Sequence, residues 1–115
     1  MTILVLGSTG QLASHLRERL PAATFWSRAE ADLSAPESLA AKIIALRPGA
    51  IVNAAAYTAV DRAESEPDLA WRVNAEAPAA VARAAQALDV PFIQVSTDYV
   101  FDGSKNGAYL VTDPV

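Results

Sequence analysis

Short apolar runs alternate along the chain with segments whose apolar residues recur at helical spacing. Continuous apolar runs of this kind are typical of strands that are buried on both faces of a parallel sheet. The four runs are residues 2–6 (TILVL), 23–26, 50–53 and 90–96 (VPFIQVS). Each run is separated from the next by a segment long enough for a helix, so the pattern predicts four strands with helices between them.

The first two intervening segments each carry an apolar stripe with the period of an α-helix. The first has a leucine at every fourth position and ends at Pro21, because proline cannot continue a helix. The second is predicted to start at a capping box formed by Ser34 and Glu37 and to stop at residues 47–49. The stripe residues are Leu12, Leu16, Leu20, Leu39, Ala40, Ile43 and Ile44.

The third helix is expected to be longer, and it is rich in alanine, which favours helix and allows close packing on a sheet. Ser65 with Asp68 has the spacing of a cap at its start, and the helix continues to about Leu88. Pro78 should bend it, because the proline nitrogen cannot donate to the carbonyl of Asn74. The expected buried side consists of Leu69, Val73, Ala77, Ala80, Ala84 and Leu88.

This order of elements, with short links, requires parallel strands joined by right-handed crossovers. The predicted fold class is therefore α/β, a Rossmann-like doubly wound parallel sheet of about four strands. Residues 97–115 contain two glycines and one proline and are expected to be loop. We interpret residues 1–115 as one dinucleotide-binding domain.

Composition excludes several classes of protein. Nine Lys and Arg against thirteen Asp and Glu give a net charge of −4, which disfavours a nucleic-acid surface. There is no Cys and one His, so neither a disulfide framework nor a Cys or multi-His metal site is expected. No apolar run reaches the ~18 residues that a membrane span needs, and no basic region of a signal peptide begins the chain. A cytoplasmic protein without nucleic-acid or membrane partners is expected.

The strongest chemical signal is the turn GSTGQLA at residues 7–13, between the first strand and the first helix. Gly7 permits a tight turn, Gly10 lets the backbone approach a pyrophosphate, and the helix N-terminus offers free N–H groups. Ala13 stands where a third glycine is usual, and it is small enough for close helix–strand packing. A glycine-rich turn without a ligand is the alternative, but the strand–turn–helix context favours dinucleotide binding.

The choice of cofactor is read at the end of the second strand, where NAD sites usually place an acidic residue for the ribose 2′-hydroxyl. Residues 25–28 read FWSR and contain no carboxylate. Arg28 could pair with a 2′-phosphate, which favours NADP or tolerance of both cofactors, although a merely exposed arginine is an equal alternative. Asp32 and Leu33 could border the adenine, or Asp32 could simply open the turn before Ser34.

Two more segments follow strands at the same edge of the predicted sheet. The small residues of 53–58 (NAAAYT) leave room for a flat ligand, although they could equally serve packing. The segment STDY at 96–99 puts the Thr97 hydroxyl where it could donate to a carbonyl oxygen under attack by hydride, or it is only a hydroxyl-rich turn.

Other candidates give weaker signals. The acidic residues between 61 and 68 are expected to form a solvated helix end rather than a metal site. His15 is expected to be exposed or at a rim, and Trp71 to serve packing or an interface. No serine–histidine–aspartate triad is indicated.

Four segments together resemble the N-terminal part of the dTDP-4-dehydrorhamnose reductase family, which belongs to the extended short-chain dehydrogenases/reductases. They are residues 7–13 (GSTGQLA), 32–33 (DL), 51–78 (IVNAAAYTAVDRAESEPDLAWRVNAEAP) and 90–103 (VPFIQVSTDYVFDG). The resemblance implies reduction of the C4 keto group of dTDP-4-dehydro-L-rhamnose by NADPH or NADH. It also implies a nucleotide-sugar substrate, a role in cell-surface polysaccharide synthesis and a possible homodimer.

The resemblance also implies roles for individual residues. Thr97 matches the catalytic hydroxyl of the family, Asp98 its neighbour at the sugar nucleotide, and Asn74 the helix asparagine of the superfamily. The implied cofactor contacts are Gly10, Gln11 and Leu12 at the pyrophosphate, Asp32 and Leu33 at the adenine, Ala56, Tyr57 and Thr58 on the nicotinamide-ribose side, and Val95 beneath the nicotinamide.

The family donates its proton from the tyrosine of a Tyr-x-x-x-Lys motif, and this sequence contains no such motif. In the family that motif and a C-terminal substrate domain follow the matched part, so we expect these 115 residues to belong to a longer reductase. Alone they should bind cofactor without turnover, because a placed acid contributes ~10²–10⁴-fold. The unpaired edge of the fourth strand further predicts self-association or marginal stability.

Two alternatives remain for the function. One is another extended member that acts as a nucleotide-sugar epimerase or dehydratase, although such enzymes usually carry an acidic residue after the second strand. The other is a non-catalytic, NADP-binding regulatory subunit.

Overall fold

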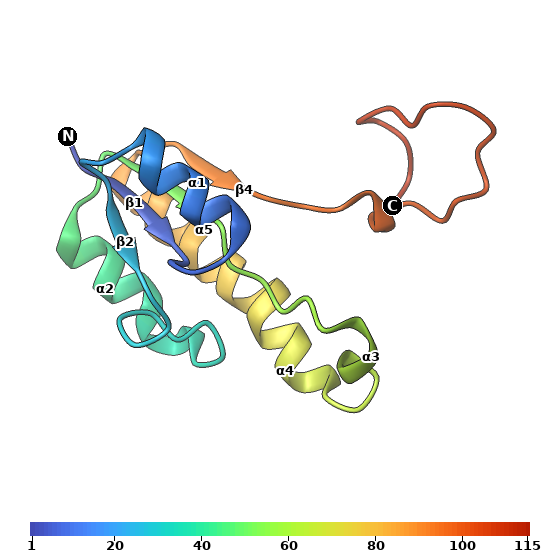
Figure 1. The fold of residues 1–115 in the computed structure, drawn as a ribbon, viewed down its shortest axis with the longest axis horizontal. Coiled ribbons are helices and arrows are strands. Elements are labelled where there is room, and N and C mark those ends of the chain that lie inside the picture. Colours follow the sequence, from blue (N-terminus) through green and yellow to red (C-terminus); the bar gives the residue numbers. More distant parts are fainter.

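The computed structural model describes residues 1–115. Four parallel strands form one sheet in the order β2-β1-β3-β4, with helices on both faces (Figure 1). This confirms the predicted α/β class. The strands are β1 (Ile3–Leu6), β2 (Thr24–Trp26), β3 (Ala50–Asn53) and β4 (Phe92–Gln94). Each lies inside a predicted run, but β4 has three residues where seven were expected.

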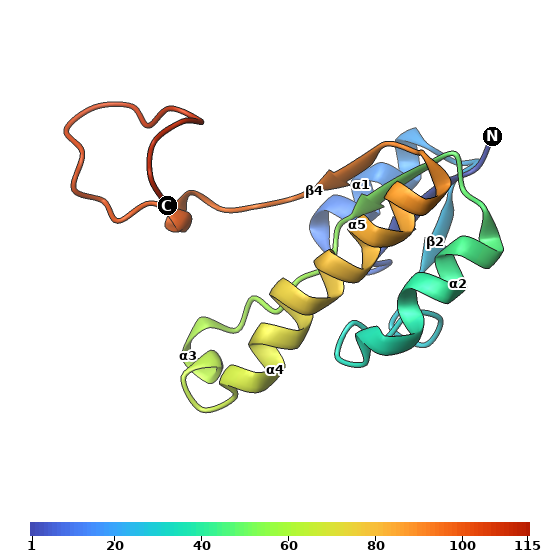
Figure 2. The ribbon, with the colours of Figure 1, turned by 180° about the vertical axis from the view of Figure 1, so that it is seen from behind.

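Helices α2 and α5 cover one face of the sheet and α1 lies over the other (Figures 1 and 2). The α-helices are α1 (Gln11–Arg19), α2 (Leu39–Leu46), α3 (Val60–Ala63), α4 (Pro67–Trp71) and α5 (Ala77–Leu88). Short 3₁₀ turns lie at Pro36–Ser38 and Asp98–Val100, and a π-helical turn at Arg72–Glu76 joins α4 to α5. None of the helices is both long and apolar enough to cross a membrane.

The main core lies between the sheet and the pair α2 and α5. Leu4 and Leu6 point into it from β1, because alternate residues of a strand face the same side. Four alanines of α5 are buried against the sheet, as its alanine-rich composition predicted. The expected burial of Ile44 on α2 is wrong, because its side chain is 41% exposed.

Neither predicted cap begins a helix. The backbone N–H and the hydroxyl of Ser34 both donate to Oδ1 of Asp32, at 2.9 and 2.6 Å, so the serine closes an Asp turn instead of a capping box. Ser65 donates its hydroxyl to the carbonyl of Arg62 at 3.0 Å, and α4 begins after it at Pro67. Both serines hydrogen-bond to groups two or three residues upstream instead of capping a helix. Such local bonds compete with helix capping in short polar side chains.

The proline in the long helix changes the hydrogen-bond register upstream. Ala77 donates to the carbonyl of Arg72, five residues back, at the end of the π-helical turn. A π-turn inserts one extra residue, and here it lies directly ahead of Pro78, which lacks an N–H. Trp71 lies at the start of this irregular stretch and is 65% exposed, so of the two expected roles, packing or an interface, the interface stays a prediction.

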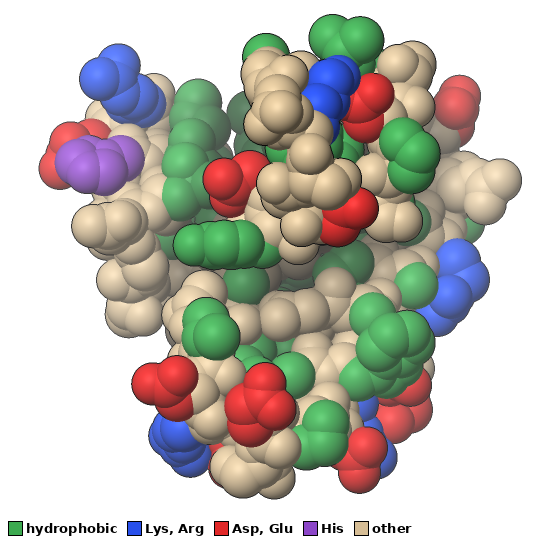
Figure 3. Space-filling model, turned by 90° about the vertical axis from the view of Figure 1, so that its right-hand side faces the viewer, with side chains coloured by type: hydrophobic (Ala, Val, Ile, Leu, Met, Phe, Trp, Pro, Cys, Tyr) green, Lys and Arg blue, Asp and Glu red, His purple; other side chains and the backbone are tan.

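The face of the sheet beneath α1 is only partly covered. A groove of about 330 Å³ runs between α1 and strands β1, β3 and β4. Its lining includes the three stripe leucines of α1, which share one helix face as predicted, and Leu12 is 40% exposed. Ile93 and Val95 line the same groove, and they are 60% and 49% exposed, respectively. Hydrophobic side chains also reach the surface on the side of the molecule from which the C-terminal segment extends (Figure 3).

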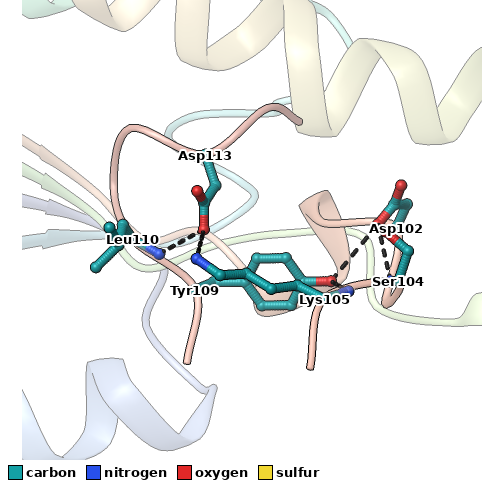
Figure 4. A network of polar contacts seen from close by, with 6 residues as sticks. All are labelled: Asp102, Ser104, Lys105, Tyr109, Leu110 and Asp113. Atoms are coloured by element: carbon teal, nitrogen blue, oxygen red, sulfur yellow. Dashed lines mark hydrogen bonds and ion pairs between the residues drawn. The ribbon is translucent and has the colours of Figure 1, made fainter. Parts of the chain in front are cut away.

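Residues 96–115 extend away from the sheet (Figures 1 and 2) and are loop apart from one 3₁₀ turn, as predicted. The segment is closed by its own contacts (Figure 4). Lys105 pairs with Asp113 at 2.6 Å, and the rings of Phe101 and Tyr109 stack with centroids 4.3 Å apart. No hydrogen bond or ion pair joins it to the body of the protein.

Candidate functional site

The glycine-rich turn lies between β1 and α1, where the sequence placed it. Gly7 has a φ of +105°, and a Cβ atom added to it would lie 3.3 Å from the backbone of Ala54. Its N–H donates to the carbonyl of Trp26 at 2.9 Å, which ties the turn to the end of β2. Gly7 is therefore required by the fold itself, because other residues rarely adopt a positive φ.

Gly10 is different, because the fold does not require a glycine there. Its φ is −70°, and a Cβ atom added to it would meet nothing within 4 Å. It precedes α1, whose first N–H groups, at Gln11 and Leu12, have no acceptor in the chain and no side-chain cap. Free N–H groups and the positive end of the helix dipole favour an anion such as phosphate. Ala13 is fully buried, as close helix–strand packing predicts.

The end of β2 leads into a turn rich in charge. Arg28 is exposed, and its Nε lies 3.8 Å from Oδ1 of Asp32. The hydrogen bonds from Ser34 hold the pKa of Asp32 below its ordinary value. Leu33 is buried in the core, so it borders a ligand only through its backbone or the edge of its side chain.

A second side of the site is the loop after β3. The buried side chain of Asn53 accepts a hydrogen bond from the Ala55 N–H at 3.2 Å and donates to Oε1 of Gln94 at 2.9 Å. Asn74 binds both backbone groups of Tyr57: Oδ1 accepts from its N–H at 2.9 Å, and Nδ2 donates to its carbonyl at 3.0 Å. These side-chain roles of Asn53 and Asn74 are absent from the sequence interpretation. The only signal for the first is a polar residue at the end of an apolar run.

The side chain of Tyr57 is also held. Its hydroxyl donates to Oε2 of Glu66, and Arg62 pairs with the other carboxylate oxygen at 3.3 Å. The hydrogen bond from Tyr57 holds the pKa of Glu66 below its ordinary value, and the same bond raises the pKa of Tyr57. The Glu66 carboxylate thus accepts hydrogen bonds from both Tyr57 and Arg62. The bond to Tyr57 helps to fix the position of the loop formed by Ala56, Tyr57 and Thr58.

This bond predicts a measurable dependence of stability on pH. Because the pKa of Glu66 is lower in the folded state, Glu66 adds to the free energy of unfolding above pH 4.5, its ordinary pKa. That stabilisation is lost as the pH falls through the pKa of the folded state. On going from neutral to acidic pH, the free energy of unfolding should fall less in Glu66→Gln than in the unaltered chain, as measured by urea unfolding at each pH. Glu64→Gln is the control, since no hydrogen bond or ion pair holds the Glu64 carboxylate, and an equal response of the two variants would contradict the assignment.

The hydroxyl-rich segment follows β4 at the carboxyl edge of the sheet but leads outward. Thr97 and Asp98 are exposed, and Oγ1 of Thr97 accepts from the Tyr99 N–H at 3.2 Å. The Thr97 hydroxyl also lies 3.4 Å from a carboxylate oxygen of Asp98. No hydrogen bond joins Thr97 to the glycine-rich turn. Val95 and Leu12 do come together, in the groove beside α1.

The weaker candidates stay outside this region. His15 is exposed on α1, as expected, and its Nδ1 lies 3.9 Å from a carboxylate oxygen of Glu18. The acidic residues between 61 and 68 join no group of three or more ligands arranged for a metal ion.

Comparisons with known proteins point in one direction. Residues 1–115 match the family described as the RmlD substrate binding domain. A dTDP-4-dehydrorhamnose reductase of Burkholderia thailandensis is 45% identical over 117 residues, which cover 99% of this chain and 39% of the relative. The chain thus spans about two-fifths of the length of the curated relatives it matches.

Solved structures agree with this family. A dTDP-4-dehydrorhamnose reductase of Clostridium acetobutylicum superposes with a TM-score of 0.92 at 32% identity, over all of this chain and 42% of the other. The reductase of Bacillus anthracis, solved in complex with NADP, gives a TM-score of 0.79 at 33% identity, over 90% of this chain and 39% of the other.

Proposed function

Because the chain belongs to the family of the RmlD substrate binding domain, we propose that it is the dinucleotide-binding part of an oxidoreductase. The proposed reaction is reduction of the C4 keto group of dTDP-4-dehydro-L-rhamnose to dTDP-L-rhamnose, with NADPH or NADH. The relatives named for this enzyme and the NADP complex of the Bacillus anthracis protein support the choice.

The start of α1 is the observation that carries the proposal. The free N–H groups of Gln11 and Leu12 can donate to an anion, and the open space at Gly10 would let a pyrophosphate approach the backbone. No acidic residue lies in the first turn of α1 to repel it. The residues present therefore fit a dinucleotide.

The other residues of the site take positions around the same ligand. Asp32 and Leu33 would border the adenine, and the loop of Ala56, Tyr57 and Thr58 would face the nicotinamide ribose. The bound nicotinamide supplies the hydride. Val95 and Leu12 would exclude water from the nicotinamide side of the groove, since both are apolar and line it.

The substrate side is carried by the segment after β4. We assign the hydroxyl of Thr97 to the keto oxygen and Asp98 to the sugar nucleotide. Because both lie on a segment without a hydrogen bond to the body, its docking over the glycine-rich turn is part of this proposal.

We further propose a cytoplasmic protein with a nucleotide-sugar substrate and no nucleic-acid or membrane partner. We also propose a homodimer, which the resemblance to the reductase family implies.

Fluorescence titration of the purified chain with NADPH tests the proposed function. We expect saturable binding, and no oxidation of NADPH when the keto sugar is added, because the chain has no Tyr-x-x-x-Lys motif. Adenosine monophosphate should compete, since it occupies only the adenine and phosphate positions. Absence of saturable binding would overturn the cofactor role, and turnover with the keto sugar would overturn the assignment of the missing acid.

A further inference from the structure

A carboxylate stands at the end of β2 although the strand itself ends without one. Ser27 is the first residue after β2, and its N–H donates to Oε2 of Glu30 at 2.7 Å. The Ser27 hydroxyl donates to the same oxygen. A short turn thus brings a side chain from three residues downstream back to the strand end, with its second oxygen left free of protein partners.

This strand end lies beside the glycine-rich turn. The residue before Ser27, Trp26, accepts the hydrogen bond from the Gly7 N–H at 2.9 Å. In doubly wound folds the acidic group at this place meets the ribose 2′-hydroxyl of NAD. The carboxylate of Glu30 therefore lies at the end of β2, where residues 25–28 (FWSR) contain no acidic side chain.

The surrounding charges decide how a 2′-phosphate would fare there. The two hydrogen bonds from Ser27 lower the pKa of Glu30, so it is ionised at neutral pH. Two cations face the same turn: Arg28, which pairs with Asp32, and Lys42, whose Nζ donates to the Glu30 carbonyl at 3.0 Å. Since Asp32 partly neutralises Arg28, neither sign of charge dominates.

We propose that Glu30 is a specificity-determining residue that accepts the ribose 2′-hydroxyl of NADH and repels the 2′-phosphate of NADPH, against the attraction of Arg28. This rests on the proposed function, since it requires a nicotinamide dinucleotide at the glycine-rich turn. The chain then selects its cofactor by the balance of two side chains from one turn.

The test is the ratio of the dissociation constants for NADPH and NADH, measured by fluorescence titration of the 115-residue chain. Glu30→Gln keeps an oxygen that can accept from Ser27 and removes the charge. We expect the ratio Kd(NADPH)/Kd(NADH) to fall about three- to tenfold, and more at low than at high salt. Arg28→Ala should move the ratio in the opposite direction.

Two further variants keep the test sharp. Glu18→Gln removes an equal charge from the exposed face of α1, where Glu18 lies against His15, and should leave the ratio unchanged. Ser27→Asp, added to Glu30→Gln, restores an acid at the strand end and should raise the ratio again.

The outcomes separate this inference from the proposed function. Binding of both cofactors with an unchanged ratio in Glu30→Gln overturns the role of Glu30 alone, as does an equal change in Glu18→Gln. Absence of binding of either cofactor to the unaltered chain overturns the proposed function, and the specificity role with it.

Discussion

A chain carrying Gly7→Ala should unfold more readily by about 2–4 kcal/mol and should no longer bind NADPH measurably. The alanine would have to adopt a φ of +105°, and its methyl group would lie 3.3 Å from the backbone of Ala54. Relief of that contact would move the turn away from β3, and the start of α1 with it. Urea unfolding followed by tryptophan fluorescence gives the stability, and fluorescence titration gives the binding.

Gly10→Ala is the matched control, because it adds the same methyl group in the same turn. Its φ of −70° suits alanine, and nothing lies within 4 Å of the added atom, so stability should change by less than about 1 kcal/mol. NADPH affinity should nevertheless fall about tenfold or more, since the methyl group enters the space reserved for pyrophosphate. Unchanged affinity in Gly10→Ala would place the ligand elsewhere.

The fold could be predicted because its signals are local. Each strand carries an apolar run and each helix an apolar period, and the four resemblance segments identify a family that the comparisons confirm. Element ends were predicted less well. Ser34 has the spacing of a cap, but the Asp32 carboxylate lies nearer and takes both of its donors. Pairwise competition of this kind depends on turn geometry that spacing does not contain.

The candidate site divides in the same way. Gly7 opens a glycine-rich turn between a strand and a helix, so the sequence suffices to find it, and its positive φ agrees with that position. The contact of Glu30 with Ser27 depends on a turn, and that of Asn74 with Tyr57 joins residues seventeen positions apart. Such contacts arise only when the chain folds, and the residue types alone permit many other partners. The roles given to Thr97 and Val95 remain predictions.

Asn53→Leu should lower the free energy of unfolding by about 2–3 kcal/mol, because its amide is almost completely buried, at 1% exposure. Leucine has a similar volume but leaves the Ala55 N–H without its acceptor and Gln94 without its donor. The loss of the first bond also frees the loop that holds Tyr57, so NADPH affinity should fall with stability. Urea unfolding and NADPH titration of the same sample measure both.

A variant of Gln94, the hydrogen-bond partner of Asn53, tests whether the loss in Asn53→Leu comes from the buried amide or only from a change of side-chain shape. Gln94 is exposed, and its Nε2 already donates to the Val95 carbonyl at 2.9 Å, so Gln94→Leu should cost less than about 1 kcal/mol. The losses of unfolding free energy in the two single variants should sum to more than the loss in the double variant, by about 0.5–1.5 kcal/mol. The reason is that each single variant already removes the one hydrogen bond that the two side chains share. If Asn53→Leu costs no more than Gln94→Leu, the amide does not hold the end of β3. The loop that faces the proposed nicotinamide ribose would then be positioned by Asn74 and Glu66 alone.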